Sequence, residues 1–364
     1  MVSVSRRSLL ALGAALPVLG RLDWAVANPT PATSDTVLLN YNESPYGPST
    51  AALEAMGRGS AAAGRYPYPH LYALAALFAR QQGIAEERVA VFAGSMAGLR
   101  YAVLAFTRPT RGLVMATPSY EVPRQAAASN QAPVREVNLD AAHAHDVPAM
   151  LAADPQAGML YLCNPNNPTG TLTPTEAIRQ ALANKPKGSV LVVDEAYIDF
   201  CDAPSCVSWT SNHDDLLVLR TFSKIYGMAG ARLGLAIGHP ALLEQLAVFG
   251  GDNVPAGASL LGAHASLEDV KLLGQRKALN ATVRDETIAW LKDRGFRCTA
   301  SQSNCFMIDV KQPAEQVIER LAAQNVLVGR VWSNWPQWVR VTVGNRQEME
   351  RFRQVFATQI VGVG

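Results

Sequence analysis

Apolar and polar positions follow two different patterns along this 364-residue chain. Residues 157–163 (AGMLYLC), 188–193 (GSVLVV) and 215–221 (DLLVLRT) are apolar without alternation, which is typical of strands buried on both faces. Residues 88–95 and 112–120 also read as strands that run into turns. Apolar residues recur with helical spacing in 71–83, 96–107 and 173–184. Strands that alternate with helices predict a mostly parallel sheet covered by helices on both faces.

Local signals mark where two of these helices begin and end. Gly83 closes the first helix, because glycine favours the left-handed backbone that ends a helix. Thr173 is the expected N-cap of the later helix, with Pro174 at its first position and Glu176 at its third.

The pattern changes after residue 250. Residues 257–295 are largely helical, and short strands at 305–310, 326–331 and 338–344 are interspersed with two further helices. We therefore predict an α/β fold with four parts: a signal peptide (1–27), an irregular N-terminal arm that opens with a short strand (28–50), a large domain with the parallel sheet (51–250), and a smaller α+β domain (251–364).

The first 27 residues have the features of an export signal. Arg6 and Arg7 precede a modest apolar run, and Ala25-Val26-Ala27 fits an A-x-A cleavage site. The apolar run is shorter than the roughly 20 residues that span a bilayer. The segment SRRSLL resembles a twin-arginine signal, so the translocase of that pathway is an expected partner and the periplasm the expected compartment. An ordinary secretory signal or a misassigned start is the alternative.

Composition and charge exclude several classes of protein. The chain is 49% hydrophobic and 17% charged, enough for a sizeable core, and it has no low-complexity segments. Removal of the signal takes away three arginines and one aspartate, which lowers the net charge from +2 to 0. Neither nucleic acid nor an anionic membrane is therefore an expected partner.

The cysteines and histidines give weak signals only. The five cysteines include no C-x-x-C pair, so a disulfide framework is not expected. Cys201 and Cys206 are close enough to pair in an oxidising compartment, or they are free thiols. His143 and His145 suggest either a metal site or, more simply, a solvated loop. We predict no metal.

Polar residues gather where the predicted strands end. The clusters are Gly94-Ser95, Tyr120, residues 164–170, residues 194–197 and residues 221–224. Ligands of doubly wound sheets bind outside the carboxyl ends of the strands. Five separate strand ends are thus expected to meet at one site.

Two of these residues suggest the chemistry of the site. Lys224 follows the end of a predicted strand, where a catalytic lysine is more typical than a surface one. A lysine can form a Schiff base with an aldehyde cofactor. Asp194 follows four apolar residues, and an aspartate can hold a pyridinium nitrogen protonated, which makes the ring an electron sink. Taken alone, Lys224 also reads as a surface lysine, and Asp194 as a helix cap or half of a core salt bridge.

Other clusters supply what a phosphorylated ring requires. A phosphate needs backbone N–H groups at a helix N-terminus, hydroxyl groups and a bidentate cation. The helix start in AGSMAG, the hydroxyls of Ser223 and Thr221, and Arg232 provide these groups. Tyr120 can stack on a ring, and Asn167 and Tyr197 can donate to a ring oxygen.

With these motifs in this order, the chain resembles the fold-type I, pyridoxal-phosphate-dependent aminotransferases of class I and II, and among them the histidinol-phosphate aminotransferases. The matching stretches run from LNYNESPYGPS and RYPYP through AGSMAG, TPSYEVP, CNPNNPTG, VVDEAYIDF and RTFSKIYGMAGARLG to VRVTVGNRQEM. The resemblance implies pyridoxal 5′-phosphate as cofactor, a homodimer and a three-layer large domain. It covers residues 38 to 349.

The resemblance also implies roles for individual residues. Lys224 carries the cofactor covalently and moves the substrate proton, and Asp194 pairs with the ring nitrogen. The remaining cofactor contacts are assigned to Ser95, Met96, Tyr120, Asn167, Tyr197, Thr221, Ser223 and Arg232, and to Tyr66 reaching the neighbouring subunit's cofactor phosphate.

On the substrate side, the resemblance assigns Arg340 to a substrate carboxylate or phosphate and places Tyr46 at the substrate mouth. Taken alone, Arg340 also reads as a surface arginine at a sheet edge. Residues 326–338 look unusual for the family and bring Arg330 and three tryptophans toward this side.

The expected reaction moves an amino group between an L-amino acid, or a histidinol-phosphate-like amine, and a 2-oxo acid. A decarboxylase of the same fold and a non-catalytic protein that retains the cofactor are the alternatives. The donor and the acceptor are not identifiable from the sequence.

Overall fold

The computed structural model describes residues 35–250 and 253–361. The expected signal peptide and residues 28–34 of the arm lie outside these ranges. The described residues from Val37 onward form one compact unit. No helix in the described part of the chain is long and apolar enough to cross a membrane. The predicted division near residue 250 stays a prediction.

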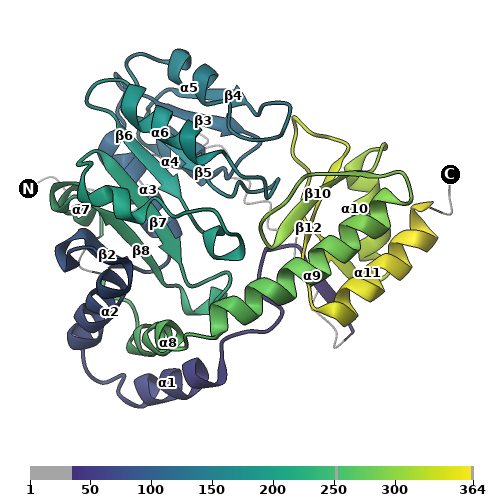
Figure 1. Ribbon diagram of the computed structural model, residues 1–364, viewed down its shortest axis with the longest axis horizontal. Helices are drawn as coiled ribbons and strands as arrows, with labels where there is room; N and C mark the ends of the chain where they lie inside the picture. The colour runs from purple at the N-terminus through teal and green to yellow at the C-terminus, as the bar shows by residue number, and fades with distance from the viewer. Residues whose placement is uncertain (1–34, 251–252, 362–364) are drawn as a thin grey trace, which may run out of the picture. The chain divides into compact units, whose positions relative to one another are not determined.

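A seven-stranded sheet forms the centre of the fold (Figure 1). Its spatial order is β2-β8-β7-β6-β5-β3-β4, and β8 is antiparallel to both of its neighbours while the other pairs that the register defines are parallel. The prediction of a mostly parallel sheet is therefore confirmed. The strands are β2 (Val89–Phe92), β3 (Leu113–Thr117), β4 (Val134–Asn138), β5 (Met159–Cys163), β6 (Val190–Asp194), β7 (Leu216–Thr221) and β8 (Gly234–Gly238).

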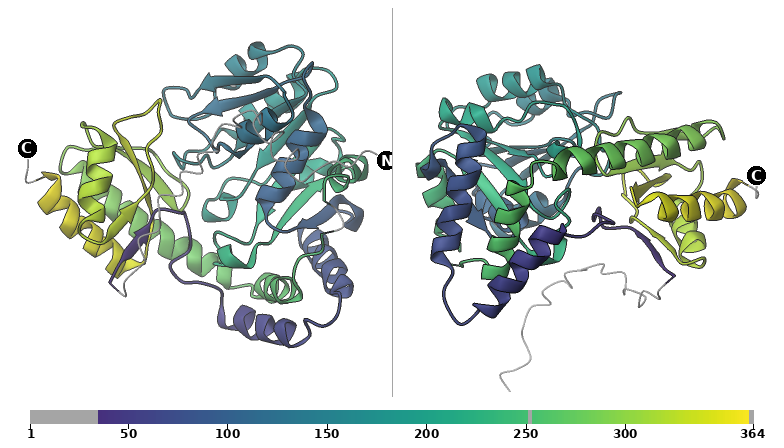
Figure 2. Two further views of the ribbon diagram at one scale, coloured as in Figure 1. Left: turned by 180° about the vertical axis from the view of Figure 1, so that it is seen from behind. Right: turned by 60° about the horizontal axis from the view of Figure 1, so that its bottom comes forward.

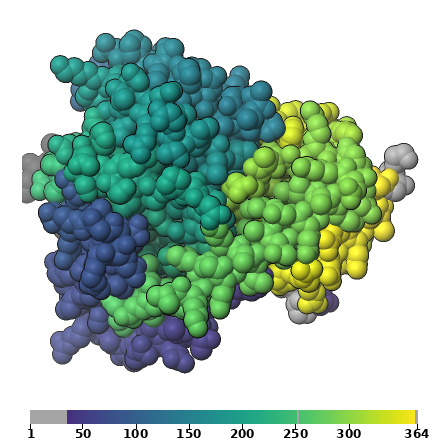
Figure 3. Space-filling model, viewed as in Figure 1, coloured from purple at the N-terminus to yellow at the C-terminus, as the bar shows by residue number. Residues whose placement is uncertain are grey.

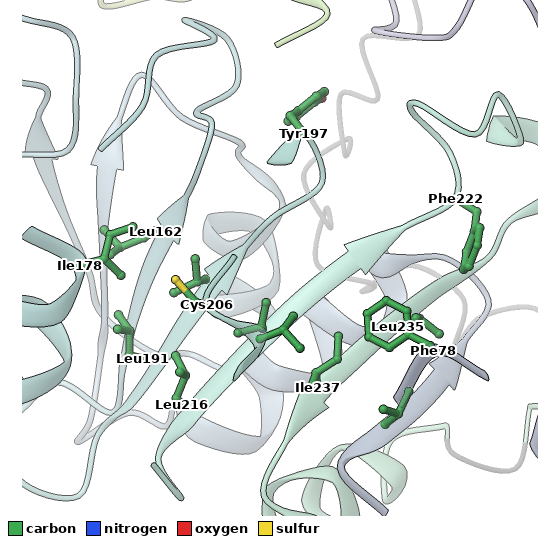
Figure 4. Packing of buried hydrophobic residues seen from close by; sticks show 14 of the residues in the cluster. Phe78, Leu162, Ile178, Leu191, Tyr197, Cys206, Leu216, Phe222, Leu235 and Ile237 are labelled. Carbon is green, nitrogen blue, oxygen red and sulfur yellow. The ribbon is translucent and has the colours of Figure 1, made fainter. Parts of the chain in front are cut away.

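The central strands are buried along their whole length, as their unbroken apolar runs predict. Successive side chains point to opposite faces of the sheet. Leu162 and Leu191 belong to the core on one face, shown in Figure 4. Tyr161 and Val192 belong to the core on the other face. Two hydrophobic layers thus enclose the sheet.

Helices on both faces supply the rest of these cores (Figure 2). They are α1 (Thr50–Ala61), α2 (Tyr68–Gln82), α3 (Ser95–Phe106), α4 (Val122–Ser129), α5 (Val147–Ala153), α6 (Thr175–Asn184), α7 (Pro240–Ala247) and α8 (Gly257–Glu268), with short 3-10 turns η1 (Glu86–Arg88), η2 (Ile198–Phe200), η3 (Val207–Ser211) and η4 (Ala229–Ala231).

The C-terminal part has a hydrophobic core of its own. It contains a three-stranded antiparallel sheet and three helices: β9 (Arg297–Cys298), β10 (Cys305–Asp309), β12 (Trp338–Thr342), α9 (Leu272–Lys292), α10 (Ala314–Ala322) and α11 (Arg346–Gln359). These elements lie within the green to yellow region of Figure 3.

The short strand of the N-terminal arm joins this C-terminal part. β1 (Val37–Leu39) pairs in parallel with β11 (Val326–Val328) in a separate two-stranded sheet and is not part of the seven-stranded sheet. Val37 and Leu39 are buried in the C-terminal core. Residues 40–49 therefore connect β1, in the C-terminal part, to α1, which packs with the helices of the large sheet.

Gly83 ends α2 in the left-handed conformation, as predicted. The expected start of α6 is wrong by one residue: the N-cap is Pro174, and the Thr173 hydroxyl instead accepts a hydrogen bond from the backbone of His145. The expected solvated loop is also wrong for His145, because this side chain is buried beside Cys163.

The described residues hold no cluster of three side chains that suits a metal ion. Cys201 and Cys206 are both free and buried.

Candidate active site

The carboxyl ends of β2, β3, β5, β6 and β7 surround one cleft of about 840 Å³. Parallel strands bring their carboxyl ends to the same edge of a sheet, which is why residues distant in sequence meet here. Twelve predicted site residues line this cleft: Ser95, Met96, Tyr120, Asn167, Asp194, Tyr197, Thr221, Ser223, Lys224, Arg232, Arg330 and Arg340.

Asp194 is the last residue of β6 and is 4% exposed. Burial raises the pKa of its carboxyl group to about 6, because a low-dielectric surrounding disfavours the charged form. Two hydrogen bonds oppose this effect: the Tyr161 hydroxyl donates to Oδ2 at 2.9 Å, and the backbone N–H of Ala196 donates to Oδ1 at 3.1 Å. Ionisation of the Asp194 carboxyl group is thus unfavourable in the absence of a cationic partner, and such a partner would stabilise the carboxylate.

Lys224 follows the end of β7 and lies in the same cleft. Its Nζ is 3.3 Å from the carbonyl oxygen of Tyr41 and 5.7 Å from the centre of the Tyr197 ring. Burial, and then the positive charge of Arg340, lower the pKa of the Lys224 amine to about 8. An amine with this pKa is partly neutral near physiological pH and therefore nucleophilic.

At the far end of the cleft the N-terminus of α3 meets Arg232. Gly94, the N-cap of α3, has φ +94° and provides no side-chain cap. A Cβ at Gly94 would lie 2.5 Å from Arg232 Nη2, and a Cβ at Gly234 would lie 2.2 Å from the backbone nitrogen of Ser95. Only glycine permits this approach of backbone and guanidinium.

Hydroxyl groups complete this end of the cleft. Arg232 Nη1 is 3.4 Å from Ser223 Oγ, and the Thr221 hydroxyl accepts a hydrogen bond of 3.1 Å from the backbone of Ser223. The helix N-terminus, the hydroxyls and the guanidinium form a set of donors of the kind that binds a phosphate. We call this set the anion cradle.

At the opposite end, Arg340 of β12 is 9% exposed. Its Nη1 donates to Asn167 Oδ1 at 2.9 Å, and its Nη2 donates to the carbonyl oxygen of Asn40. The Arg340 Nε and the Trp332 Nε1 are buried without a hydrogen-bond partner. This end of the cleft therefore holds donor capacity that the protein itself leaves unused.

Arg330 lies at the same end but is engaged elsewhere. Its guanidinium forms an ion pair with Glu121 and lies 4.6 Å from the centre of the Trp332 ring. Glu121 also accepts from Arg124 at 2.9 Å, and Arg124 pairs with Glu136 at 3.2 Å. Four alternating charges thus link β4 and α4 to the loop before β12.

Two predicted site residues lie outside this cleft. Tyr46 lines a second, smaller cavity that it shares with Phe200, Arg276 and Asn304. Tyr66 is 83% exposed. Its expected role concerns a second subunit, so a single chain places it on the surface.

Four further residues line the cleft or contact a residue that lines it, and none of the four was predicted from the sequence. Arg100 and Asn42 line it, and Asn42 Nδ2 donates to the Tyr197 hydroxyl at 3.1 Å. Glu121 holds Arg330, and Tyr161 holds Asp194. Tyr161 was hidden because a tyrosine inside an apolar strand reads as core. Glu121 follows directly on Tyr120, but nothing in the sequence pairs it with residue 330.

Comparison with known proteins gives a consistent result. The model of the family "Aminotransferase class I and II" matches residues 34–356. The histidinol-phosphate aminotransferase of Bacillus subtilis is 31% identical over 330 residues, which are 88% of this chain and 91% of that protein.

Solved structures agree with this result. A putative histidinol-phosphate aminotransferase from Erwinia carotovora atroseptica superposes with a TM-score of 0.86 at 27% identity, covering 90% of this chain and 97% of the other. A histidinol-phosphate aminotransferase from Sinorhizobium meliloti, in complex with pyridoxal 5′-phosphate, gives 0.82 at 23% identity, covering 90% and 91%. At that identity the second likeness shows the fold alone.

The chain belongs to the class I and II aminotransferase family. It is a transaminase whose cofactor is pyridoxal 5′-phosphate. The residues present fit this cofactor: the anion cradle suits its phosphate, the buried Asp194 suits its ring nitrogen, and the low-pKa amine of Lys224 suits its aldehyde. When bound, the cofactor supplies an electron sink for charge that develops at the substrate Cα.

Proposed function

We propose that this protein transfers an amino group from an L-amino acid to a 2-oxo acid, with the cleft residues in the roles given above. Arg340 carries the proposal. A buried guanidinium that lines the same cleft as Lys224, and that donates to the neutral oxygens of Asn167 and Asn40 rather than to a carboxylate, is suited to a substrate carboxylate. Both the donor and the acceptor present such a carboxylate.

Each end of the cleft has a separate task. Asp194 holds the ring nitrogen, the anion cradle holds the phosphate, and Tyr120 packs on the ring. The Tyr197 hydroxyl accepts from Asn42 and keeps its own proton to donate to the ring oxygen. Lys224 moves a proton to and from the substrate Cα. Asn167 contacts Arg340 directly and therefore couples the two ends.

A histidinol-phosphate-like amine is the second candidate. The matched B. subtilis relative has that activity in its name, and Arg330 together with Arg340 provides two guanidinium groups. The ion pair of Arg330 with Glu121 favours the first candidate, because it offsets one of the two charges that a phosphate dianion would use. The decarboxylase and the non-catalytic alternatives have no support from the family match.

The test is transfer of ¹⁵N. Purified protein with added cofactor is incubated with a panel of ¹⁵N-labelled L-amino acids, 2-oxo acids and histidinol phosphate, and the products are analysed by mass spectrometry. We expect ¹⁵N in the amino acid formed from the 2-oxo acid. Release of CO₂ with no label transferred would contradict the proposal, and transfer from histidinol phosphate alone would support the second candidate instead.

We also propose that the protein acts as a homodimer in which Tyr66 contacts the cofactor phosphate held by its partner. Large exposed side chains concentrate in residues 38–72: Leu38, Tyr41, Tyr46, Leu53, Tyr66, Tyr68 and Tyr72. Such a concentration of exposed aromatic residues is typical of an interface.

Mixing two impaired variants tests this arrangement. Lys224→Ala and Tyr66→Ala subunits, each weak alone, are unfolded and refolded together at equal ratio. If Tyr66 acts across the dimer, half of the dimers are mixed and each has one intact site, so about a quarter of parental activity returns. A monomer by light scattering, or no recovery on mixing, would contradict the proposal.

Finally, we propose that the protein is exported to the periplasm by the twin-arginine pathway, as the pair Arg6-Arg7 suggests. Replacing both arginines by lysine should retain a folded, cofactor-loaded precursor in the cytoplasm. Cell fractionation with an immunoblot and a cofactor assay measures this. Mature variant in the periplasm at the parental level would contradict it.

A further inference from the structure

Tyr161 places a polar atom in the middle of an apolar core. It is a residue of β5, its side chain is 0% exposed, and it packs in the hydrophobic layer that includes Leu99 and Val122. A buried hydroxyl costs free energy unless it forms a hydrogen bond. Its partner is Asp194 Oδ2 at 2.9 Å.

Strand register explains how these side chains meet. β5 and β6 are parallel, with Tyr161 opposite Val192 and Cys163 opposite Asp194. Tyr161, Cys163, Val192 and Asp194 therefore project from the same face of the sheet. Tyr161 is opposite Val192, and its side chain is long enough to reach Asp194, two residues further along β6. Its hydroxyl therefore contacts the carboxylate from the hydrophobic core and not from the cleft.

We propose that Tyr161 is a positioning residue, whose hydroxyl holds the Asp194 carboxylate ionised and in place for the cofactor's ring nitrogen. This inference rests on the proposed function of Asp194 as the partner of that nitrogen. Tyr161 itself does not line the cleft, so it acts only through Asp194.

The groups around Asp194 make this hydrogen bond important. Cys163 from β5 and Tyr120 from the loop before α4 face the carboxylate, and burial raises the pKa of both, so both stay neutral at physiological pH. Lys224 is the cation whose charge lowers the pKa of Asp194, but the hydrogen bond from Tyr161 has the larger effect. Burial still leaves the pKa of Asp194 raised to about 6.

The sign of the effect follows. The Tyr161 hydroxyl donates to the carboxylate and so stabilises the ionised form, which lowers the pKa of Asp194. Its removal raises that pKa further above 6. Near pH 8.5 Asp194 is ionised with or without the Tyr161 hydroxyl. Near pH 5.5 Asp194 must lose a proton before it can pair with a protonated ring. The free energy of this deprotonation is higher in a protein that lacks the Tyr161 hydroxyl.

The alternative is that Tyr161 only fills space. A phenylalanine at this position would then serve equally well, since it retains the ring that packs against the apolar layer. Tyr161→Phe removes one oxygen atom and separates the two roles. Tyr226→Phe is the matched control, because Tyr226 is also buried, lies next to Asp199 and Arg220, and does not line the cleft.

The experiment measures the dissociation constant of pyridoxal 5′-phosphate from the apoprotein between about pH 5.5 and 8.5, by fluorescence titration. For Tyr161→Phe we expect about tenfold weaker binding at the acid end and nearly parental binding at the alkaline end, a shift of about one pH unit in the acid limb. The control should follow the parent at every pH. Parental binding by Tyr161→Phe throughout, or equal weakening at all pH values, would overturn the inference.

A double-mutant cycle distinguishes this inference from the proposed function. In an Asp194→Asn background, Tyr161→Phe should add no pH-dependent loss, because there is no carboxylate left to ionise. An additive, pH-dependent loss in that background would also overturn the inference. If Asp194→Asn alone leaves the cofactor dissociation constant unchanged, the proposed role of Asp194 fails instead. Circular dichroism of each apoprotein confirms that the comparison is between folded proteins.

Discussion

The two ends of the cleft are built in different ways. Asp194 at the cofactor end belongs to a strand paired on both sides, and it is held by hydrogen bonds from Tyr161 and Ala196. At the substrate end, Arg330 lies in a loop, is 51% exposed, and is held by an ion pair. Sheet register fixes the first arrangement, whereas a surface ion pair contributes about 0–1 kcal/mol to the second.

This difference indicates how the site is able to vary. Groups fixed by register are difficult to move without disturbing the sheet, and they serve the cofactor, which is common to the family. A group on a loop, such as Arg330, changes at little cost to stability, whereas Arg340, proposed to bind the substrate carboxylate, lies in the paired strand β12. Changes at the cofactor end should therefore remove activity, whereas changes at the substrate end should redirect it.

The largest effect is expected for Lys224→Ala. We propose that this amine is the nucleophile toward the cofactor and the base at the substrate Cα, so turnover should fall by about 10⁴-fold or more. Steady-state assays with saturating cofactor measure this, with Lys277→Ala as control, since Lys277 is paired with Asp202 away from the cleft. Residual turnover above about a hundredth of the parental rate would be incompatible with both roles.

Asp194→Asn should lower the rate by about 10²–10³-fold, in keeping with loss of a preorganised charge. Asparagine has nearly the same shape and keeps an oxygen for the Ala196 N–H, so the sheet should remain intact. Single-turnover kinetics with saturating cofactor separate the chemical step from cofactor loss. An unchanged single-turnover rate would show that the ring nitrogen does not depend on this charge.

Arg340→Lys should raise KM for the carboxylate substrate by about tenfold to a hundredfold, because an ammonium group cannot reproduce a bidentate contact. The cofactor dissociation constant should change by less than about threefold, which corresponds to under 1 kcal/mol. Both are measured on the same preparation. Equal losses in the two constants would mean that Arg340 supports the cofactor rather than the substrate, and the comparison between the ends would fail.

The rate of cofactor binding to the apoprotein should depend on pH through Lys224. Its pKa is lowered to about 8, and only the neutral amine attacks an aldehyde. The rate should therefore rise by nearly tenfold from about pH 6.5 to 7.5 and level off above pH 8. Stopped-flow absorbance measures it. A midpoint near the ordinary lysine value of 10.5 would contradict the buried setting of this amine.

The smallest effect is expected for Glu121→Gln, which releases Arg330 from its ion pair. The preference for a phosphate-bearing amine over an L-amino acid, expressed as the ratio of kcat/KM values, should rise by about threefold to tenfold. Glu136→Gln is the control, because Glu136 pairs only with Arg124 in the same chain of charges and does not reach Arg330. An equal change in both variants would mean that the effect is a general one of surface charge.

The sequence predicted the cofactor end well because its signals are local. An apolar run followed by a polar residue marks the end of a parallel strand, and such ends meet at one edge of the sheet, so Asp194, Lys224 and Arg232 were placed together correctly. The mostly parallel sheet was predicted for the same reason.

What the sequence did not predict depends on contacts across the fold. Tyr161 reaches Asp194 through a register that one strand alone does not define. Glu121 and Arg330 are 209 residues apart, and only the folded chain pairs them. Tyr46 was expected at the substrate mouth, but the path of residues 40–49 carries it into a separate small cavity. Loop paths of this kind follow from packing rather than from periodicity.

The central claim is that Lys224 binds the cofactor covalently at the end of β7. Reduction of the loaded protein with borohydride, followed by tryptic peptide mapping, tests it directly. A modified Lys224 resists trypsin, so we predict one uncleaved peptide, residues 221–232, that carries the mass of a reduced pyridoxyl group. The modification on another lysine, such as Lys277, or peptides 221–224 and 225–232 recovered separately and unmodified, would contradict the account.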